Sequence, residues 1–253
     1  MPSKTSLSLN PPAYQFRPLR EAIFIGILIL IATTHANYFL YQKALEAQKG
    51  EINDGLMLLS KALVKFIEPS LHQSLTAREQ QYTEAYREAL VPLAKVLQGS
   101  KEIVNVYTMV RRDEDILFVL DPTPSGDIDH DGQEDKAFLM EKYESPPHEL
   151  RQAFAAQQYT VTEHPYQDKW GEHFSSFTPL LDEQGNMYGM LGLDLSAEGY
   201  RKRLYPIQRH FVRTSAVSVF IAFIVACFIW FLRRFCQVVH QNRMQLINFL
   251  RKE

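Results

Sequence analysis

Two long apolar segments near the ends of the chain constrain its architecture more than any other feature of the sequence. They cover residues 22–41 and 211–232, and each has about the 20 residues that a helix needs to cross the hydrocarbon core of a membrane. Arg213 interrupts the second segment, so its outer edge falls near Ser215, and the roughly 18 residues that remain are still long enough. The sequence therefore predicts two membrane-spanning helices with a folded domain between them.

The charges that flank these segments predict the side of the membrane that each part occupies. Basic residues precede the first segment with no acidic residue before Glu21, and they follow the second against Glu253 alone: Lys4, Arg17, Arg20, Arg233, Arg234, Arg243, Arg251 and Lys252. By the positive-inside rule both termini are cytoplasmic. The expected division is a cytoplasmic tail at 1–20, spanning helices at 21–42 and 211–233, an extracytoplasmic domain at 43–210 and a short cytoplasmic helix at 234–253. The alternative for the first segment is a cleaved signal peptide, but its apolar core is long and no small-residue cleavage site follows it.

The part of the chain between the two segments is acidic. Residues 42–213 contain 27 of the 29 acidic residues, all but Glu21 and Glu253, and 19 of the 27 basic residues. A nucleic-acid-binding surface needs a basic face, so this balance argues against nucleic acid as a partner. Both cysteines, Cys227 and Cys236, lie in or beyond the second apolar segment, so the domain must be stabilised by its core rather than by disulfides.

Two helices are expected at the start of the domain. The helical pattern continues from the first apolar segment to about Glu68, where Pro69 ends it, and a second helix is expected over 76–98 because Thr76 and Glu79 match a capping box. Apolar residues recur along the first helix at heptad spacing, namely Ile52, Leu56, Leu59, Leu63 and Phe66. This seam has two interpretations, which are packing on the sheet of the domain and pairing with a second copy of the chain.

The remainder of the domain is predicted to be mostly strands. Alternating apolar runs indicate two hairpins, formed by strands 103–110 and 116–120 around a charged turn and by strands 172–179 and 187–195 around the turn formers of 182–186. A short helix is expected at 148–157, and another helix at 197–210 leads back to the membrane.

The second hairpin carries a resemblance to a known family. Its fragments are, in order, Trp170-Gly171, Ser175-Ser176-Phe177-Thr178-Pro179-Leu180, Asp182-Glu183-Gln184-Gly185 and Gly189-Met190-Leu191-Gly192-Leu193-Asp194-Leu195-Ser196. In this order and spacing they resemble the last strands of Cache domains, which are PAS-like extracytoplasmic sensor modules of bacterial transmembrane receptors. The resemblance implies an α+β fold, with a single antiparallel sheet preceded by long helices and flanked here by the two spanning helices. It also implies a two-pass protein of a bacterial inner membrane.

The resemblance further implies where a ligand binds, which is between the central sheet and the loops that cover it. The matching positions are Tyr107, Arg112, Tyr143, Trp170, Ser175 and Asp194. Arg112 is expected to hold a carboxylate and Asp194 an amine, so the expected small-molecule ligand is an amino acid or an organic acid. The alternatives are that Arg112 belongs to a solvated turn and that Asp194 merely ends the last strand.

An acidic run in the middle of the domain matches the first part of a calcium-binding loop. The candidate ligands are Asp127, Asp129, Asp131 and Asp135, with Gly132 at the turn. The twelfth position, which normally supplies a bidentate glutamate, is Phe138. Calcium is therefore the one candidate cofactor, and an acidic surface loop without metal is the alternative. The acidic and histidine residues at 163–173 fit no standard transition-metal spacing.

The sequence contains no nucleophile motif, no phosphate-binding glycine loop and no complete metal signature, so we expect a protein that is not an enzyme. The favoured hypothesis is a membrane-anchored sensor that detects a small extracytoplasmic ligand and signals to a separate protein or through a homodimer. Two alternatives stay open. One is a non-catalytic accessory subunit of a membrane complex, and the other is the input half of a receptor whose output domain is separate.

Overall fold

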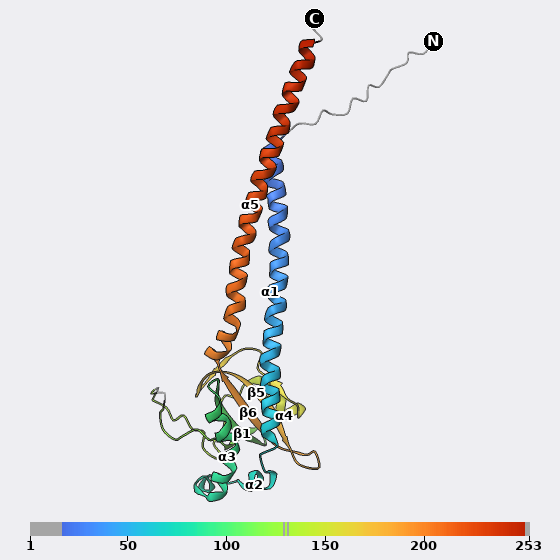
Figure 1. Cartoon of the computed structure of the whole chain (residues 1–253). Helices are drawn as coiled ribbons and strands as arrows, with labels where there is room; N and C mark the ends of the chain where they lie inside the picture. The colour runs from blue at the N-terminus through green and yellow to red at the C-terminus, as the bar shows by residue number, and fades with distance from the viewer. Residues whose placement is uncertain (1–16, 129, 131, 251–253) are drawn as a thin grey trace, which may run out of the picture. The chain divides into compact units, whose positions relative to one another are not determined.

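The computed structural model describes residues 17–128, 130 and 132–250 (Figure 1). The chain divides into two compact units. One unit is Ala44–Pro206, and the other contains the two ends of the chain, up to Lys43 and from Ile207 onwards. We describe each unit in turn.

The helices and strands follow one another along the chain in the order that the sequence predicts. The elements are α1 (Pro18–Val64), α2 (Pro69–Ser74), the 3-10 helix η1 (Arg78–Tyr82), α3 (Glu84–Gly99), β1 (Ile103–Arg112), β2 (Asp115–Leu120), α4 (His148–Ala156), β3 (Thr160–Val161), β4 (Tyr166–Asp168), β5 (Gly171–Leu181), β6 (Met187–Ser196) and α5 (Ala197–Leu250). The α+β fold class is confirmed, and so are both hairpins and the short helix that begins at His148.

A single antiparallel sheet forms the centre of the unit Ala44–Pro206. Its strands lie in the order β2-β1-β6-β5-β3, and β4 also pairs with β5. The three long strands β1, β6 and β5 are neighbours, and their register places Gly192 between Tyr107 on β1 and Phe177 on β5. Two pairs further along, Asp194 lies opposite Ser175.

The two faces of this sheet carry separate clusters of buried side chains, because successive residues of a strand point to opposite faces. Along β6, Leu191, Leu193 and Leu195 belong to a core cluster that includes residues of α1 and α3. Met190 belongs to a second cluster that includes Leu150 and other residues of α4. Tyr107 and Tyr143 are also in this second cluster, so the candidate ligand-binding residues gather on the face away from α1.

The seam predicted on α1 packs on the sheet. Ile52, Leu56 and Leu63 are buried in the cluster that α1 shares with the sheet, and Ser60 beside them receives a hydrogen bond from Thr178 of β5 at 2.7 Å. Phe66 lies beyond the end of the helix and is 71% exposed. The heptad spacing of this segment therefore describes contact with the domain's own core, which was the first of the two interpretations.

The start of the second helix differs from the prediction. The segment after Thr76 forms the 3-10 helix η1, and α3 begins at Glu84 with Thr83 as its N-cap. The Thr76–Glu79 capping box is therefore wrong. The side chain of Gln80 accepts hydrogen bonds from the backbone N–H groups of Thr76 and Ala77 at 2.7 and 2.8 Å, which closes a separate short turn instead.

The second unit consists of two helices that are long and apolar enough to cross a membrane, the N-terminal part of α1 and the C-terminal part of α5. They run side by side here (Figure 1). Asn37 of α1 donates a hydrogen bond to Ser215 at 2.8 Å and accepts one from Thr214 at 2.7 Å. The three helical segments that were expected from residue 197 onwards form one uninterrupted helix, α5, because Pro206 is accommodated within it.

A buried histidine joins α2 to the sheet. His72 is 1% exposed, and its Nε2 is hydrogen-bonded to Oγ1 of Thr108 at 2.9 Å, which in turn accepts the N–H of Leu120 at 3.1 Å. Burial lowers the pKa of His72 from its ordinary value of 6.5 to about 4. The imidazole is therefore neutral in the folded domain at neutral pH.

This depressed pKa predicts an acid-sensitive contribution to stability. Between pH 6.5 and 4 the unfolded chain binds a proton at His72 that the folded domain does not, so stability falls as the pH decreases through this window. From pH 7 to pH 4 the wild-type domain should lose about 3 kcal/mol more of its unfolding free energy than a His72→Gln variant. Urea unfolding of the segment Ala44–Pro206 at a series of pH values measures this difference. Parallel pH profiles of the two proteins would contradict it.

Candidate functional site

A small cavity lies on the sheet face away from α1. It is lined by residues of β1, β2, β4, β6, the segment after β2 and the turn between β4 and β5: Asn105, Tyr107, Phe118, Asp121, Asp135, Ala137, Tyr143, Asp168, Trp170 and Asp194. Among these described residues there are four aspartates and no lysine or arginine. The volume that the centre of a water molecule can occupy between the side chains is about 10 Å³. This is roughly enough room for one water molecule.

Asp194 lies at the base of this cavity and is 2% exposed. Its carboxylate accepts hydrogen bonds from the Tyr107 hydroxyl at 3.1 Å and from the Asn105 amide at 3.2 Å. Both donors are on β1, directly across from β6, so the strand register brings them together. Burial raises the pKa of Asp194 above its ordinary value, and the histidine nearby and the donors oppose this shift. The nearby histidine and the hydrogen-bond donors therefore offset only part of the cost of burying this carboxyl group.

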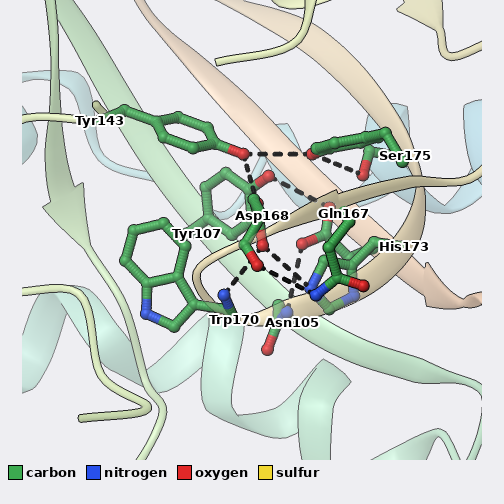
Figure 2. Close-up of polar contacts among 10 residues, drawn as sticks. Asn105, Tyr107, Tyr143, Gln167, Asp168, Trp170, His173 and Ser175 are labelled. Carbon is green, nitrogen blue, oxygen red and sulfur yellow. Dashed lines mark hydrogen bonds and ion pairs between the residues drawn. The ribbon is translucent and has the colours of Figure 1, made fainter. Parts of the chain in front are cut away.

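Asp168 is a second buried carboxylate in the same cavity, with its side chain 4% exposed. It accepts the Tyr143 hydroxyl at 2.5 Å and the backbone N–H of Trp170 at 2.9 Å. Figure 2 shows Tyr107, Tyr143 and Trp170 on one side of Asp168 and His173 on the other. The Tyr143 hydroxyl also meets that of Tyr166 at 3.2 Å, and Tyr166 accepts a hydrogen bond from Ser175 at 3.1 Å.

His173 connects the two carboxylates electrostatically. Its Nε2 is 3.5 Å from Asp168, and its side chain is 5% exposed. Burial opposes a positive charge on the ring, but hydrogen bonding to Asp168 and the charge of Asp194 outweigh it, so the pKa of His173 is raised. A protonated His173 supplies one positive charge beside the two carboxyl groups.

Aromatic rings form the other walls of the cavity. Phe118 contacts the rings of Tyr107, Tyr143 and Trp170 with centroid distances of 5.4, 5.1 and 5.0 Å. The indole Nε1 of Trp170 is buried and makes no hydrogen bond with the described residues. The walls therefore offer aromatic rings beside two carboxyl groups, which suits a small organic cation.

Five of the six residues expected to bind a ligand meet at this site. Tyr107, Tyr143, Trp170 and Asp194 line the cavity, and Ser175 lies just behind it, hydrogen-bonded to Tyr166. Arg112 does not reach the cavity. It is exposed at the end of β1, where it pairs in register with Asp115 across a tight turn. This position agrees with the alternative given for Arg112, a solvated turn, although β1 continues as far as Arg112 itself.

Asn105, Tyr166, Asp168 and His173 were not among the expected ligand-binding residues. A signal for two of them is present in the sequence. Tyr166, Asp168 and Trp170 alternate, so in an extended chain they point to the same side. The pairing of β4 with β5 then fixes them over the end of the sheet, with Asp168 opposite Gly171, which adopts a φ of 121°.

The calcium prediction concerns the loop between β2 and α4. Asp129 and Asp131 lie outside the described residues. The described carboxylates accept backbone N–H groups, Asp127 that of Gly132 at 3.0 Å and Asp135 that of Ile128 at 2.5 Å. Within the described part of the chain, no group of three or more His, Cys, Asp or Glu residues could hold a metal ion. Calcium binding stays a prediction for this loop.

Comparison with known proteins gives distant structural neighbours. No protein-family model and no curated protein matches the chain. The ligand-binding domain of the Campylobacter jejuni chemoreceptor Tlp3 in complex with L-valine is 16% identical with a TM-score of 0.45, and the sensory domain of the same receptor with isoleucine bound is 15% identical with a TM-score of 0.46. Each comparison covers 72% of this chain and 66% of the other, so the chain spans just under two thirds of the length of those domains.

The fold is established by the elements themselves. One antiparallel sheet follows α1, α2, η1 and α3, carries α1 and α3 on one face and the polar cavity on the other, and is flanked by two helices long enough to span a membrane. The chain thus contains an α+β domain with a single antiparallel sheet between two candidate membrane-spanning helices.

Proposed function

We propose that this protein is a membrane-anchored sensor whose Cache-like domain binds a small ligand with a protonated amine. The domain performs no catalysis, and it passes the binding event to a separate signalling partner. The termini are cytoplasmic and the domain is extracytoplasmic, as the basic flanks of the two apolar segments indicate.

One observation carries this proposal. Asp168 and Asp194 are both buried beneath aromatic side chains, and the described lining residues supply no lysine or arginine to neutralise them. Two buried carboxylates cost several kcal/mol in desolvation unless a cation compensates them. His173 supplies at most one positive charge. A ligand ammonium group between the two aspartates would supply the other and would receive charge-assisted hydrogen bonds.

The same observation separates the two ligand classes expected from the sequence. An organic acid without an amine brings a negative charge into a cavity that already has an excess of negative charge. An amino acid or a simple amine brings the ammonium group that the aspartates need. The exposed position of Arg112 removes the partner that was expected for a ligand carboxylate. Amines and amino acids are therefore the proposed ligands, and organic acids are not.

Ligand entry requires the cavity to enlarge, because its present volume admits only about one water. The walls that would move are the side chains of Tyr143 and Trp170, which come from the covering segments rather than from the central strands. A ligand that binds the enlarged form more tightly shifts the domain towards that form. Part of α1 and part of α5 belong to the domain, and each helix continues without a break beyond it. A conformational change in the domain therefore involves both helices.

A second candidate function is supported by the small volume of the cavity. A hydrogen-bonded network of tyrosines and aspartates that fills its own space could stabilise the domain without a ligand. The protein would then be a non-catalytic accessory subunit of a membrane complex. The ligand screen below separates the two functions.

The sensor proposal predicts selective thermal stabilisation. The unfolding temperature of the segment Ala44–Pro206 is measured in the presence of amines, amino acids, organic acids or calcium. A bound amine or amino acid at a hundred times its dissociation constant should add about 2.7 kcal/mol, or roughly 5–10 °C for a domain of this size. Organic acids without an amine should give no shift.

The outcomes of the screen are distinct. A shift with an organic acid and none with any amine would contradict the proposed ligand class. No shift with any organic compound, in a cooperatively folded domain, would favour the accessory function. A shift with calcium alone would assign the acidic loop as a structural metal site and leave the cavity without a ligand.

A further inference from the structure

A second cleft lies on the opposite face of the sheet from the cavity that contains Asp168 and Asp194. It is lined by residues of α1, β6, α5 and the segment that leads from the end of α3 into β1: Ile52, Gly55, Leu56, Leu59, Ser100, Glu102, Ile103, Leu195 and Arg203. The volume that the centre of a water molecule can occupy in this cleft is about 200 Å³. An apolar cavity of about 150 Å³ is large enough to hold benzene. The cleft therefore has room for a small ligand without movement of its walls.

The floor of the cleft is aliphatic. Ile52, Leu56, Ile103 and Leu195 are buried members of the core cluster on this face, and Leu59 is partly buried against the same cluster. A water molecule occupies a cavity only where it finds two to four polar partners, which an aliphatic floor does not offer. An apolar molecule is stabilised in such a place because its own surface and that of the floor are removed from water.

Gly55 leaves the cleft open on the side of α1. It lies between Ile52 and Leu59 on the surface of the helix that lines the cleft. A Cβ added at this position would meet no atom within 4 Å among the described residues. Glycine disfavours the interior of a helix relative to alanine or leucine. A larger residue at this position would therefore favour the helix and fill the cleft at the same time.

The polar groups at the rim of the cleft already have partners. Of the described residues that line it, Glu102 and Arg203 alone carry a charge, and they form an ion pair with each other. The hydroxyl oxygen of Ser100 accepts the backbone N–H groups of Glu102 and Ile103 at 3.2 and 3.0 Å. A charged ligand would lose its hydration on entering and would find no uncompensated charge in return. The cleft consequently favours a neutral ligand.

We propose that this cleft binds a small neutral apolar molecule of about the size of a single aromatic ring. The proposal is independent of amine binding, because the two sites lie on opposite faces of the sheet and share no lining residue among those described. The bound molecule contacts both α1 and the second turn of α5, and these two helices continue beyond the domain. Its binding therefore links the two helices within the domain.

Photolabelling of the full chain in native membranes tests this site. The probe is a phenyl trifluoromethyl diazirine, a neutral aromatic molecule that attaches to neighbouring residues on illumination, and the labelled peptides are identified by mass spectrometry. Residues 100–103 lie outside both apolar helices and should be labelled. Toluene should suppress this labelling in a saturable manner. Benzoate, which has the same ring with a carboxylate, should not suppress it. Labelling of the two apolar segments by probe dissolved in the membrane provides the internal reference.

Gly55→Leu and Gly50→Leu form a matched pair of variants. Gly50 also lies in α1, and a Cβ added there likewise meets no described atom within 4 Å, but Gly50 is not one of the residues that line the cleft. Both substitutions favour the helix, so both proteins should fold. Gly55→Leu fills the cleft and should abolish the labelling of residues 100–103. Gly50→Leu should leave this labelling unchanged.

Any of three results would overturn the proposal. Residues 100–103 could stay unlabelled while the apolar segments are labelled, benzoate could suppress the labelling as well as toluene does, or Gly55→Leu could be labelled as strongly as Gly50→Leu. None of these measurements uses an amine. Failure of this site and failure of the proposed sensor function are therefore separate results.

Discussion

Asp194→Asn is expected to remove amine binding without unfolding the domain. The substitution keeps an acceptor for the Tyr107 hydroxyl but removes the negative charge that the ligand ammonium needs. Truncating one partner of a buried, hydrogen-bonded charge pair costs about 2–5 kcal/mol, so the affinity should fall by roughly 30-fold or more. Calorimetric titration of the segment Ala44–Pro206 with the amine found in the screen measures the loss.

The domain's own stability distinguishes a binding role from a structural one. Burial raises the pKa of Asp194, so the folded domain disfavours a negative charge at this position. The neutral asparagine should therefore leave the unfolding temperature unchanged or increase it. Asp113→Asn is the matched control, because Asp113 is an exposed residue of the β1–β2 turn with a φ of 54°, which asparagine tolerates. If Asp194→Asn binds the amine as tightly as the control does, Asp194 does not hold the ligand.

Gly192→Ala should both destabilise the domain and close the cavity. A Cβ at this position would lie 2.3 and 2.6 Å from Cε2 and Cζ of the Tyr107 ring. The ring cannot easily move aside, because it is 6% exposed, packs on Phe118 and donates its hydroxyl to Asp194. Overpacking of this kind costs about 1–3 kcal/mol, and the displaced ring should also lower the affinity for the amine. Urea unfolding and the same calorimetric titration measure the two effects.

Gly55→Ala provides the matched control for this substitution. Gly55 lies within α1 and has no atom within 4 Å of the position of an added Cβ. The same chemical change should therefore stabilise the helix, by up to about 1 kcal/mol. A Gly192→Ala domain that is as stable as wild type would mean that the Tyr107 ring has room to move, and the tight packing inferred at the base of the cavity would be wrong.

The fold could be predicted from the sequence wherever a local pattern has only one solution. The alternating run of Met187 to Ser196 and the turn before it specify a hairpin, and the two apolar segments specify long helices. The helix boundary at Thr83 could not be predicted in this way. Thr76 and Thr83 are both acceptable N-caps, and the choice between them depends on how Gln80 and the following turn pack.

The candidate site could likewise be predicted from the sequence only in part. Tyr107, Trp170 and Asp194 were identified from a short family-like pattern on or beside the central strands, and strand pairing brought them together. Arg112 lies at the charged turn that the sequence indicated, where its side chain is exposed and does not reach the cavity. Asp168 was not among the expected residues, because its buried position in the cavity depends on residues distant in the sequence, such as Tyr143.

The sequence by itself determined the order of the elements, the two apolar helices and the acidic character of the domain, because these depend on composition and on periodicity along the chain. Only the tertiary structure decided that two aspartates share one cavity, that Arg112 stays outside it and that Tyr107 fills the space above Gly192. The physical reason is that burial and the compensation of charge depend on residues brought together by strand pairing, and no local pattern specifies which residues those are.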